Sequence, residues 1–206
     1  TGSGSASSST YSITYDAIGN PLTYRDGITM TWEGRQLKTL VNDGTTSTYT
    51  YDADGLRTKK IVGSVATAYQ YVGGQLLRER RSNGVVLRYA YDSLGNLATI
   101  QYTNIDNWTR TYYVRTKING DVDQIYDTSG NLIAKYTYDA WGNIISITDA
   151  DGNAITASTH VAVVNPIRYR GYYWDAETGF YYLQSRYYDP ETKRFVNADE
   201  LLGVNA

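Results

Sequence analysis

Carboxylates are the groups most able to do chemistry in this chain, and six of its aspartates recur in one short pattern. Glycine follows each of them three residues later, tyrosine directly precedes five, and asparagine follows five of the glycines, Leu56 being the exception. A type I turn favours Asp at its first position, and a left-handed Gly completes the bulge that closes the hairpin. The pattern therefore predicts structural turns at Asp16, Gly19, Asp52, Gly55, Asp92, Gly95, Asp127, Gly130, Asp139, Gly142, Asp149 and Gly152.

Calcium binding and acyl transfer are the alternative uses of the acidic residues and the histidine. Asp149, Asp151 and Asn153 have the spacing of a calcium loop, but Ala154 stands where that loop needs glycine, and His160 where it needs glutamate. His160 is the only histidine, cysteine is absent, and no nucleophile-elbow sequence occurs. We therefore expect no metal and no cofactor, and we expect His160 to be an exposed loop residue.

The segments between the turns alternate with a period of two, as strands with one buried face do. Residues 87–91 and 135–138 are examples, and turn signals mostly recur about 10 to 12 residues apart. The fold class predicted is all-β, an antiparallel meander of β-hairpins with roughly 14 to 16 strands. A sheet this wide twists in a fixed hand, so we expect it to curl into a spiral or a curved shell wall.

Composition limits the partners of the chain. Its net charge of −2 predicts no nucleic-acid binding, and no apolar run reaches the roughly 18 residues of a membrane span. The basic runs Lys59–Lys60 and Arg78–Arg81 are expected to be solvated. Twenty-two tyrosines stand against two phenylalanines. Such an excess suits the packing of thin sheets, or else a sugar-binding surface.

The sequence pattern changes after Asn165, where arginines alternate with aromatic residues. Guanidinium groups stacked on aromatic rings would build a dense, rigid plug. Alternation places Tyr169, Tyr173, Tyr181 and Phe195 on candidate buried faces. The predicted plug consists of Arg168, Tyr169, Tyr173, Trp174, Tyr181, Arg186 and Phe195.

Three blocks of this segment resemble the Rhs-repeat-associated core: Tyr169–Tyr173 (YRGYY), Gly179–Leu183 (GFYYL) and Arg186–Pro190 (RYYDP). The upstream tetrads resemble the YD repeats that precede such cores. The resemblance implies a strip of hairpins that spirals into a hollow shell around a C-terminal toxin or effector, as in toxin-complex subunits, polymorphic toxins and teneurins. It implies two partners, the remainder of the shell and the cargo, and a secreted or cell-surface location.

The same resemblance implies an aspartyl autoprotease in many relatives. Asp199 matches its first carboxylate, although Glu200 replaces the usual proline and the second carboxylate would lie beyond Ala206. The mechanism needs two carboxylates that share a proton. As given, the chain is therefore expected not to be an enzyme, and self-cleavage is what the resemblance implies as an alternative for the longer parent.

These observations predict four segments: a polar linker or junction at 1–10, a YD-repeat strip at 11–164, the core at 165–199 and a truncated tail at 200–206. The function expected is that of a structural scaffold within a shell. A carbohydrate- or cell-wall-binding module and a self-cleaving core in the full-length parent are the alternatives. The open ends of the sheet also allow edge-to-edge self-association.

Overall fold

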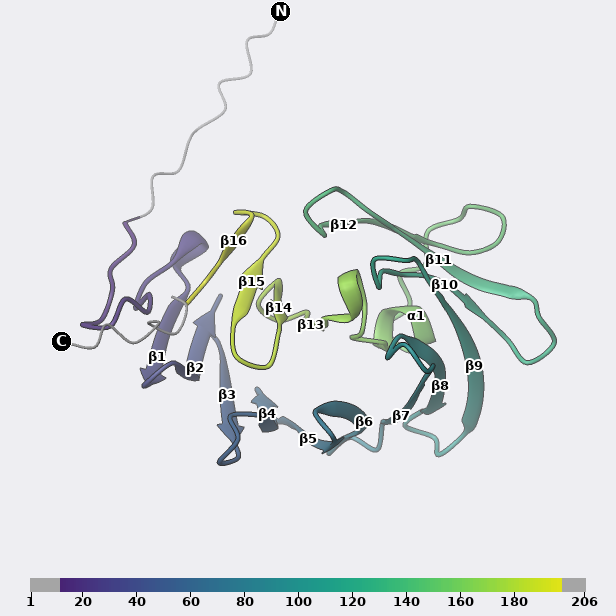
Figure 1. Ribbon diagram of the computed structural model, residues 1–206, viewed down its shortest axis with the longest axis horizontal. Coiled ribbons are helices and arrows are strands. Elements are labelled where there is room, and N and C mark those ends of the chain that lie inside the picture. Colours follow the sequence, from purple (N-terminus) through teal and green to yellow (C-terminus); the bar gives the residue numbers. More distant parts are fainter. Residues whose placement is uncertain (1–11, 198–206) are drawn as a thin grey trace, which may run out of the picture.

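The computed structural model describes residues 12–197 and contains one wide, curved antiparallel sheet that wraps around the C-terminal segment (Figure 1). Its twelve strands follow each other in sequence order, each paired with the next. This arrangement confirms the predicted all-β meander, and the sheet curves without closing. The strands are β1 (Thr29–Glu33), β2 (Gln36–Asn42), β3 (Thr45–Tyr51), β4 (Arg57–Val62), β5 (Val65–Val72), β6 (Gln75–Arg81), β7 (Val86–Tyr91), β8 (Leu97–Thr103), β9 (Thr109–Thr116), β10 (Val122–Tyr126), β11 (Leu132–Tyr138) and β12 (Ile144–Thr148).

All six Asp-x-x-Gly tetrads form turns of one geometry. In the turn at Asp92, for example, the Asp92 N–H donates to the Asn96 carbonyl at 2.9 Å and the Gly95 N–H donates to the Asp92 carbonyl at 3.1 Å. The six glycines have φ between 80° and 94°, a region in which a Cβ atom is strained. In the four turns that join two full strands, the pairing register of the strands shifts next to the turn. There the tyrosine before the tetrad pairs with the residue six positions later, as Tyr91 does with Leu97.

Alternation along the strands separates a buried concave face from an exposed convex one. Fully buried aliphatic side chains such as Leu40, Leu87 and Ile100 share the concave face with tyrosine rings. Tyrosine thus replaces leucine as the main filler of this core. The hydroxyl groups of Tyr51, Tyr91 and Tyr138 each donate to a carbonyl of the preceding strand, at 3.0, 2.7 and 2.8 Å. Their polar tips are therefore satisfied inside the sheet.

The C-terminal segment lies inside the curve of the large sheet (Figure 1). It begins with a single helical turn, α1 (Val161–Val164), and continues through a second, four-stranded antiparallel sheet. That sheet consists of β13 (Tyr173–Asp175), β14 (Phe180–Tyr182), β15 (Tyr187–Asp189) and β16 (Arg194–Phe195). Two short 3-10 turns complete the described elements, η1 (Arg25–Gly27) and η2 (Tyr169–Gly171).

Two expectations from the sequence are wrong in this segment. Phe195 is 44% exposed, because β16 is only two residues long and its ring lies between Arg186 and Tyr188 at the edge of the small sheet. His160 is half-buried instead of exposed, and its Nδ1 accepts the N–H of Ala162 at 3.2 Å. It is the N-cap of α1, a role that suits a side chain with a hydrogen-bond acceptor.

Candidate functional site

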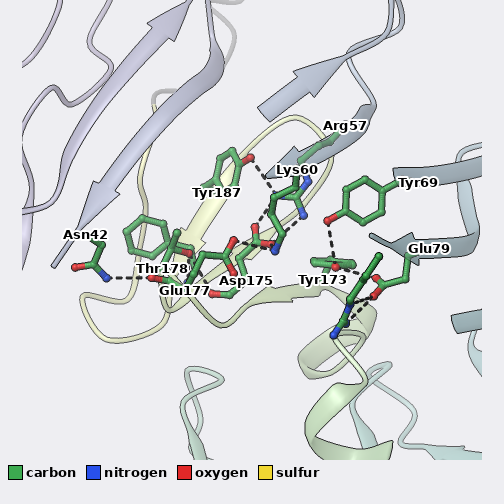
Figure 2. A network of polar contacts seen from close by, with 12 residues as sticks. Asn42, Arg57, Lys60, Tyr69, Glu79, Tyr173, Asp175, Glu177, Thr178 and Tyr187 are labelled. Atoms are coloured by element: carbon green, nitrogen blue, oxygen red, sulfur yellow. Dashed lines mark hydrogen bonds and ion pairs between the residues drawn. The ribbon is translucent and has the colours of Figure 1, made fainter. Parts of the chain in front are cut away.

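The candidate site is the docking interface, defined here as the concave face of β3 to β11 together with residues 161–197 that pack on it. Figure 2 shows its polar centre, where side chains from β4, β5 and β6 meet those of β13 and the turn that follows it. The residues that meet there are more than 90 positions apart in sequence, as Glu79 and Tyr173 are. The interface therefore fixes the path of the C-terminal segment relative to the sheet.

A buried ion pair lies at the centre of the docking interface. The Arg57 guanidinium donates to both oxygens of Asp175, at 2.6 and 3.0 Å, and both side chains are fully buried. Lys60 adds a third bond to Asp175 at 2.7 Å and also contacts Glu177 at 2.8 Å. Two cations thus face two carboxylates. An ion pair removed from water in this way is tolerable only when its hydrogen bonds are made and its charges balance.

The protonation states follow from this balance. Burial alone would raise the pKa of the Asp175 carboxyl, but the charges of Arg57 and Lys60 outweigh burial and hold it below its usual value. Burial alone would lower the pKa of Lys60 and Arg57, and the negative charge of Asp175 raises both instead. All three groups are consequently ionised at neutral pH.

Aromatic rings enclose the buried guanidinium. The Cζ atom of Arg57 lies 4.2 Å from the ring centroid of Tyr182 and 5.0 Å from that of Tyr173, both from the C-terminal segment. From the large sheet, the rings of Tyr69 and Tyr49 lie at 5.2 and 5.4 Å. The negative faces of the rings attract the cation and replace part of its lost hydration. Arg57 is therefore held from both sides of the interface.

A second cluster continues the network along β6. Tyr69 donates a hydrogen bond to the hydroxyl of Tyr173 at 3.2 Å, and Tyr173 donates to Glu79 Oε2 at 2.8 Å. Arg81 pairs with the other oxygen of Glu79 at 2.6 Å and also donates to the Val164 carbonyl at the end of α1. The cluster joins two strands of the large sheet to both ends of the 164–173 segment.

One of the six turns is held directly by the C-terminal segment. The hydroxyls of Tyr169, Tyr188 and Tyr181 donate to three consecutive carbonyls, those of Ala140, Trp141 and Gly142, at 3.0, 2.9 and 2.9 Å. The Tyr169 ring covers Gly142 so closely that a Cβ atom there would lie 2.5 Å from the ring. Glycine is thus required at this turn by close packing as well as by its positive φ.

The aspartates of the turns are occupied with hydrogen bonds inside their own turns. In the Asp127 turn, one carboxylate oxygen accepts the N–H groups of Ser129 and Asn131, and the other accepts the Asn131 side chain at 2.8 Å. The side-chain hydrogen bond from Asn131 is the largest influence that lowers the pKa of Asp127. Among the described residues, no three histidine, cysteine or carboxylate side chains gather where they could share a metal ion.

The residues predicted to form the plug differ in their burial. Arg168, Tyr169, Tyr173 and Tyr181 are buried in the docking interface. Trp174 is half-buried, with its ring 4.8 Å from that of Tyr181. Arg186 and Phe195 lie at the outer edge, where the guanidinium covers the Phe195 ring at 3.8 Å. Asp199 lies outside the described residues.

Sequence reasoning missed the charged half of the interface. The expectation that Lys60 and Arg81 are solvated is wrong, because Lys60 is buried and Arg81 pairs with buried Glu79. Arg57 was not singled out, although a signal existed. It follows the one tetrad that lacks asparagine and occupies the position at which the other repeats carry Pro21, Leu97, Leu132, Ile144 and Ala154.

A hairpin strip with an arginine- and tyrosine-rich segment docked on its concave face is the architecture of a shell-wall protein built from YD repeats. The chain belongs to the teneurin YD-shell family, whose model matches residues 3–154. No helix among residues 12–197 has the length and apolar character needed to cross a bilayer.

The relatives of the chain include tRNA nucleases and a deaminase toxin. The tRNA nuclease WapA of Bacillus subtilis is 35% identical over 91% of this chain, which spans 8% of that protein. The double-stranded DNA deaminase toxin A of Burkholderia cenocepacia is 31% identical over 47% of this chain and 6% of its own length. Among solved structures, a chain of the crystal structure of TcdB2-TccC3-TEV has a TM-score of 0.71 at 22% identity, over 90% of this chain and 10% of that one.

Proposed function

We propose that this chain is a structural scaffold, the last part of a YD-repeat shell wall and the plug attached to it, in a longer protein that encloses a C-terminal toxin or effector. The observation that carries the proposal is the docking interface, where aromatic and charged side chains of residues 161–197 fill the concave face of the sheet. A container needs such a segment at its end because an open sheet otherwise leaves its inner face in contact with water.

The chemistry of the interface supports a scaffold instead of an enzyme. The central carboxylate, Asp175, is bound by two cations, and Glu79 by Arg81 and Tyr173. A catalytic acid or base needs access to substrate and a proton it can exchange near neutral pH. Asp175 has neither, since it is buried and its pKa is lowered. The nuclease and deaminase activities in the names of the relatives belong, on this proposal, to the enclosed cargo.

We further propose the division into a YD-repeat strip at 11–164 and a core at 165–199, and a secreted or cell-surface location.

The tyrosines give little support to a carbohydrate-binding module. Tyr49, Tyr69, Tyr136 and Tyr181 face the interior, whereas stacking on a sugar needs exposed rings.

Protease protection in the full-length parent protein tests the proposal. We expect the proposed cargo, the C-terminal polypeptide of the parent protein, to resist digestion in the wild type. It should become sensitive after Tyr181→Ala, which removes a fully buried ring from the plug. Tyr113→Ala is the matched control, because that ring is 52% exposed on the large sheet. Equal digestion of the C-terminal polypeptide in the wild type and as an isolated peptide would exclude enclosure.

A further inference from the structure

Three arginines lie together on the convex face of the large sheet, on the side opposite the docking interface. Arg78 and Arg80 alternate along β6 with Glu79, which contacts the C-terminal segment, so their side chains point away from it. Arg88 on β7 likewise alternates with buried Leu87 and Tyr89. We name Arg78, Arg80 and Arg88 the arginine triad.

The strand register forces the triad together. Arg78 and Arg88 stand directly opposite each other on neighbouring antiparallel strands. Like charges in this position destabilise a sheet. Arg88 donates one hydrogen bond to Gln101 at 3.1 Å, while the Nε–H of Arg78 is buried without a hydrogen-bond partner among residues 12–197. A buried donor left unpaired adds a further cost in stability.

The triad lines one side of a shallow hollow of about 470 Å³. Its other side is formed by two turns that meet, where Gly84 lies against the backbone of Ile105. Asn104, Asn107, Thr103 and Thr109 also line the hollow, and its lining contains no carboxylate. The nearby Asp106 carboxylate accepts a hydrogen bond from the Asn104 side chain.

We propose that this hollow is a binding site for a phosphate group. A guanidinium presents a planar fork of donors that matches phosphate oxygens, and three forks around one hollow can engage several oxygens of a tetrahedral anion. A planar carboxylate would satisfy one fork and leave the others unpaired. The bound anion would offset the repulsion between Arg78 and Arg88, which stand opposite each other. The site lies on the face away from the plug, so it does not depend on the proposed enclosure of cargo.

Thermal melts with inorganic phosphate test the site on the whole chain. We expect phosphate to raise the melting temperature of the wild type at low ionic strength, and the effect to fall as sodium chloride is added. In the double variant Arg78→Gln, Arg88→Gln the phosphate affinity should fall at least about tenfold, because charge-assisted hydrogen bonds are lost. The matched control is Lys117→Gln, Lys135→Gln, which makes the same charge change at exposed positions outside the hollow.

The phosphate could be free or presented by a lipid, and co-sedimentation distinguishes the two sources. Vesicles of phosphatidylcholine with phosphatidic acid would capture the wild type but not the Arg78→Gln, Arg88→Gln variant if a headgroup is the ligand. Without phosphate, that variant should melt no lower than the wild type, because it relieves a like-charge contact. The proposal is overturned if neither source binds, or if the triad variant and the lysine control bind equally.

Discussion

At the scale of single residues, the docking interface depends on side chains that are unfavourable alone and stable together. Arg57 occupies an apolar position of the repeat, where burial of a lone cation would be prohibitive. Asp175 neutralises its charge, and four tyrosine rings surround it. A buried pair of this kind adds little net stability over an apolar pair, yet it penalises every arrangement in which one partner is missing. We infer that it selects one position of the C-terminal segment.

A double-mutant cycle tests this reading of Arg57 and Asp175. Arg57→Met should lower the free energy of unfolding by roughly 3 kcal/mol or more, because it leaves Asp175 buried with Lys60 as its remaining cation. Arg57→Met with Asp175→Leu should lose clearly less than the sum of the two single changes. Urea unfolding of the four proteins gives the coupling, and strictly additive losses would contradict a selective pair.

His160 predicts a pH dependence at neutral to mildly acidic pH. Burial lowers its pKa in the folded chain, and its Nδ1 must be unprotonated to accept the Ala162 N–H. The unfolded chain therefore binds the proton first, and stability falls as pH drops below about 6.5, the ordinary histidine value, until the folded pKa is passed. His160→Asn keeps an N-cap acceptor and should remove this slope. An unchanged slope between pH 7 and 5 in urea unfolding would assign it to other groups.

At the scale of elements, the same turn geometry occurs at all six Asp-x-x-Gly tetrads, and one of these turns also binds the C-terminal segment. The asparagine after each glycine, except at Leu56, donates to its aspartate, so that the turn satisfies itself without help from neighbouring strands. The turn at Asp139 does this too, and it also offers three backbone carbonyls to the C-terminal segment. A repeated element can therefore become a docking point without any change in its backbone.

Two glycine substitutions separate turn strain from docking. Gly130→Ala and Gly142→Ala both place a Cβ at positive φ, +84° and +94°, which should cost about 1 kcal/mol each. Only at Gly142 does the new methyl group collide with the Tyr169 ring, so this variant should lose substantially more stability. Urea unfolding measures the free energy of unfolding of both variants. Equal losses of stability would show that the turn and the C-terminal segment are loosely packed at this contact.

At the scale of the whole molecule, what the sequence predicted and what it missed have separate physical causes. Turns and strands follow from local patterns, so the meander and the positions of all six tetrads could be predicted. Arg57 and Asp175 are 118 residues apart, and their pairing depends on how far the sheet curves, which no local pattern specifies. Alternation located Tyr181 correctly within a paired strand, but it failed for Phe195 in a strand of two residues.

The edge strand β12 leaves one side of the large sheet open to pairing with another chain. Within the described residues, β12 pairs with β11 on one side only, apart from a single bridge between Thr148 and Ala154, and it exposes Ile145. An unpaired strand with an apolar side chain is a template for pairing with another chain.

We expect the isolated chain to self-associate as its concentration rises. Ile145→Lys should weaken this association because a charged edge resists pairing. Ile118→Lys, a fully exposed change in the turn between β9 and β10, is the control. Sedimentation velocity over a concentration series measures the difference. A chain that stays monomeric at every concentration, or two lysine variants that behave alike, would show that β12 is not the associating edge.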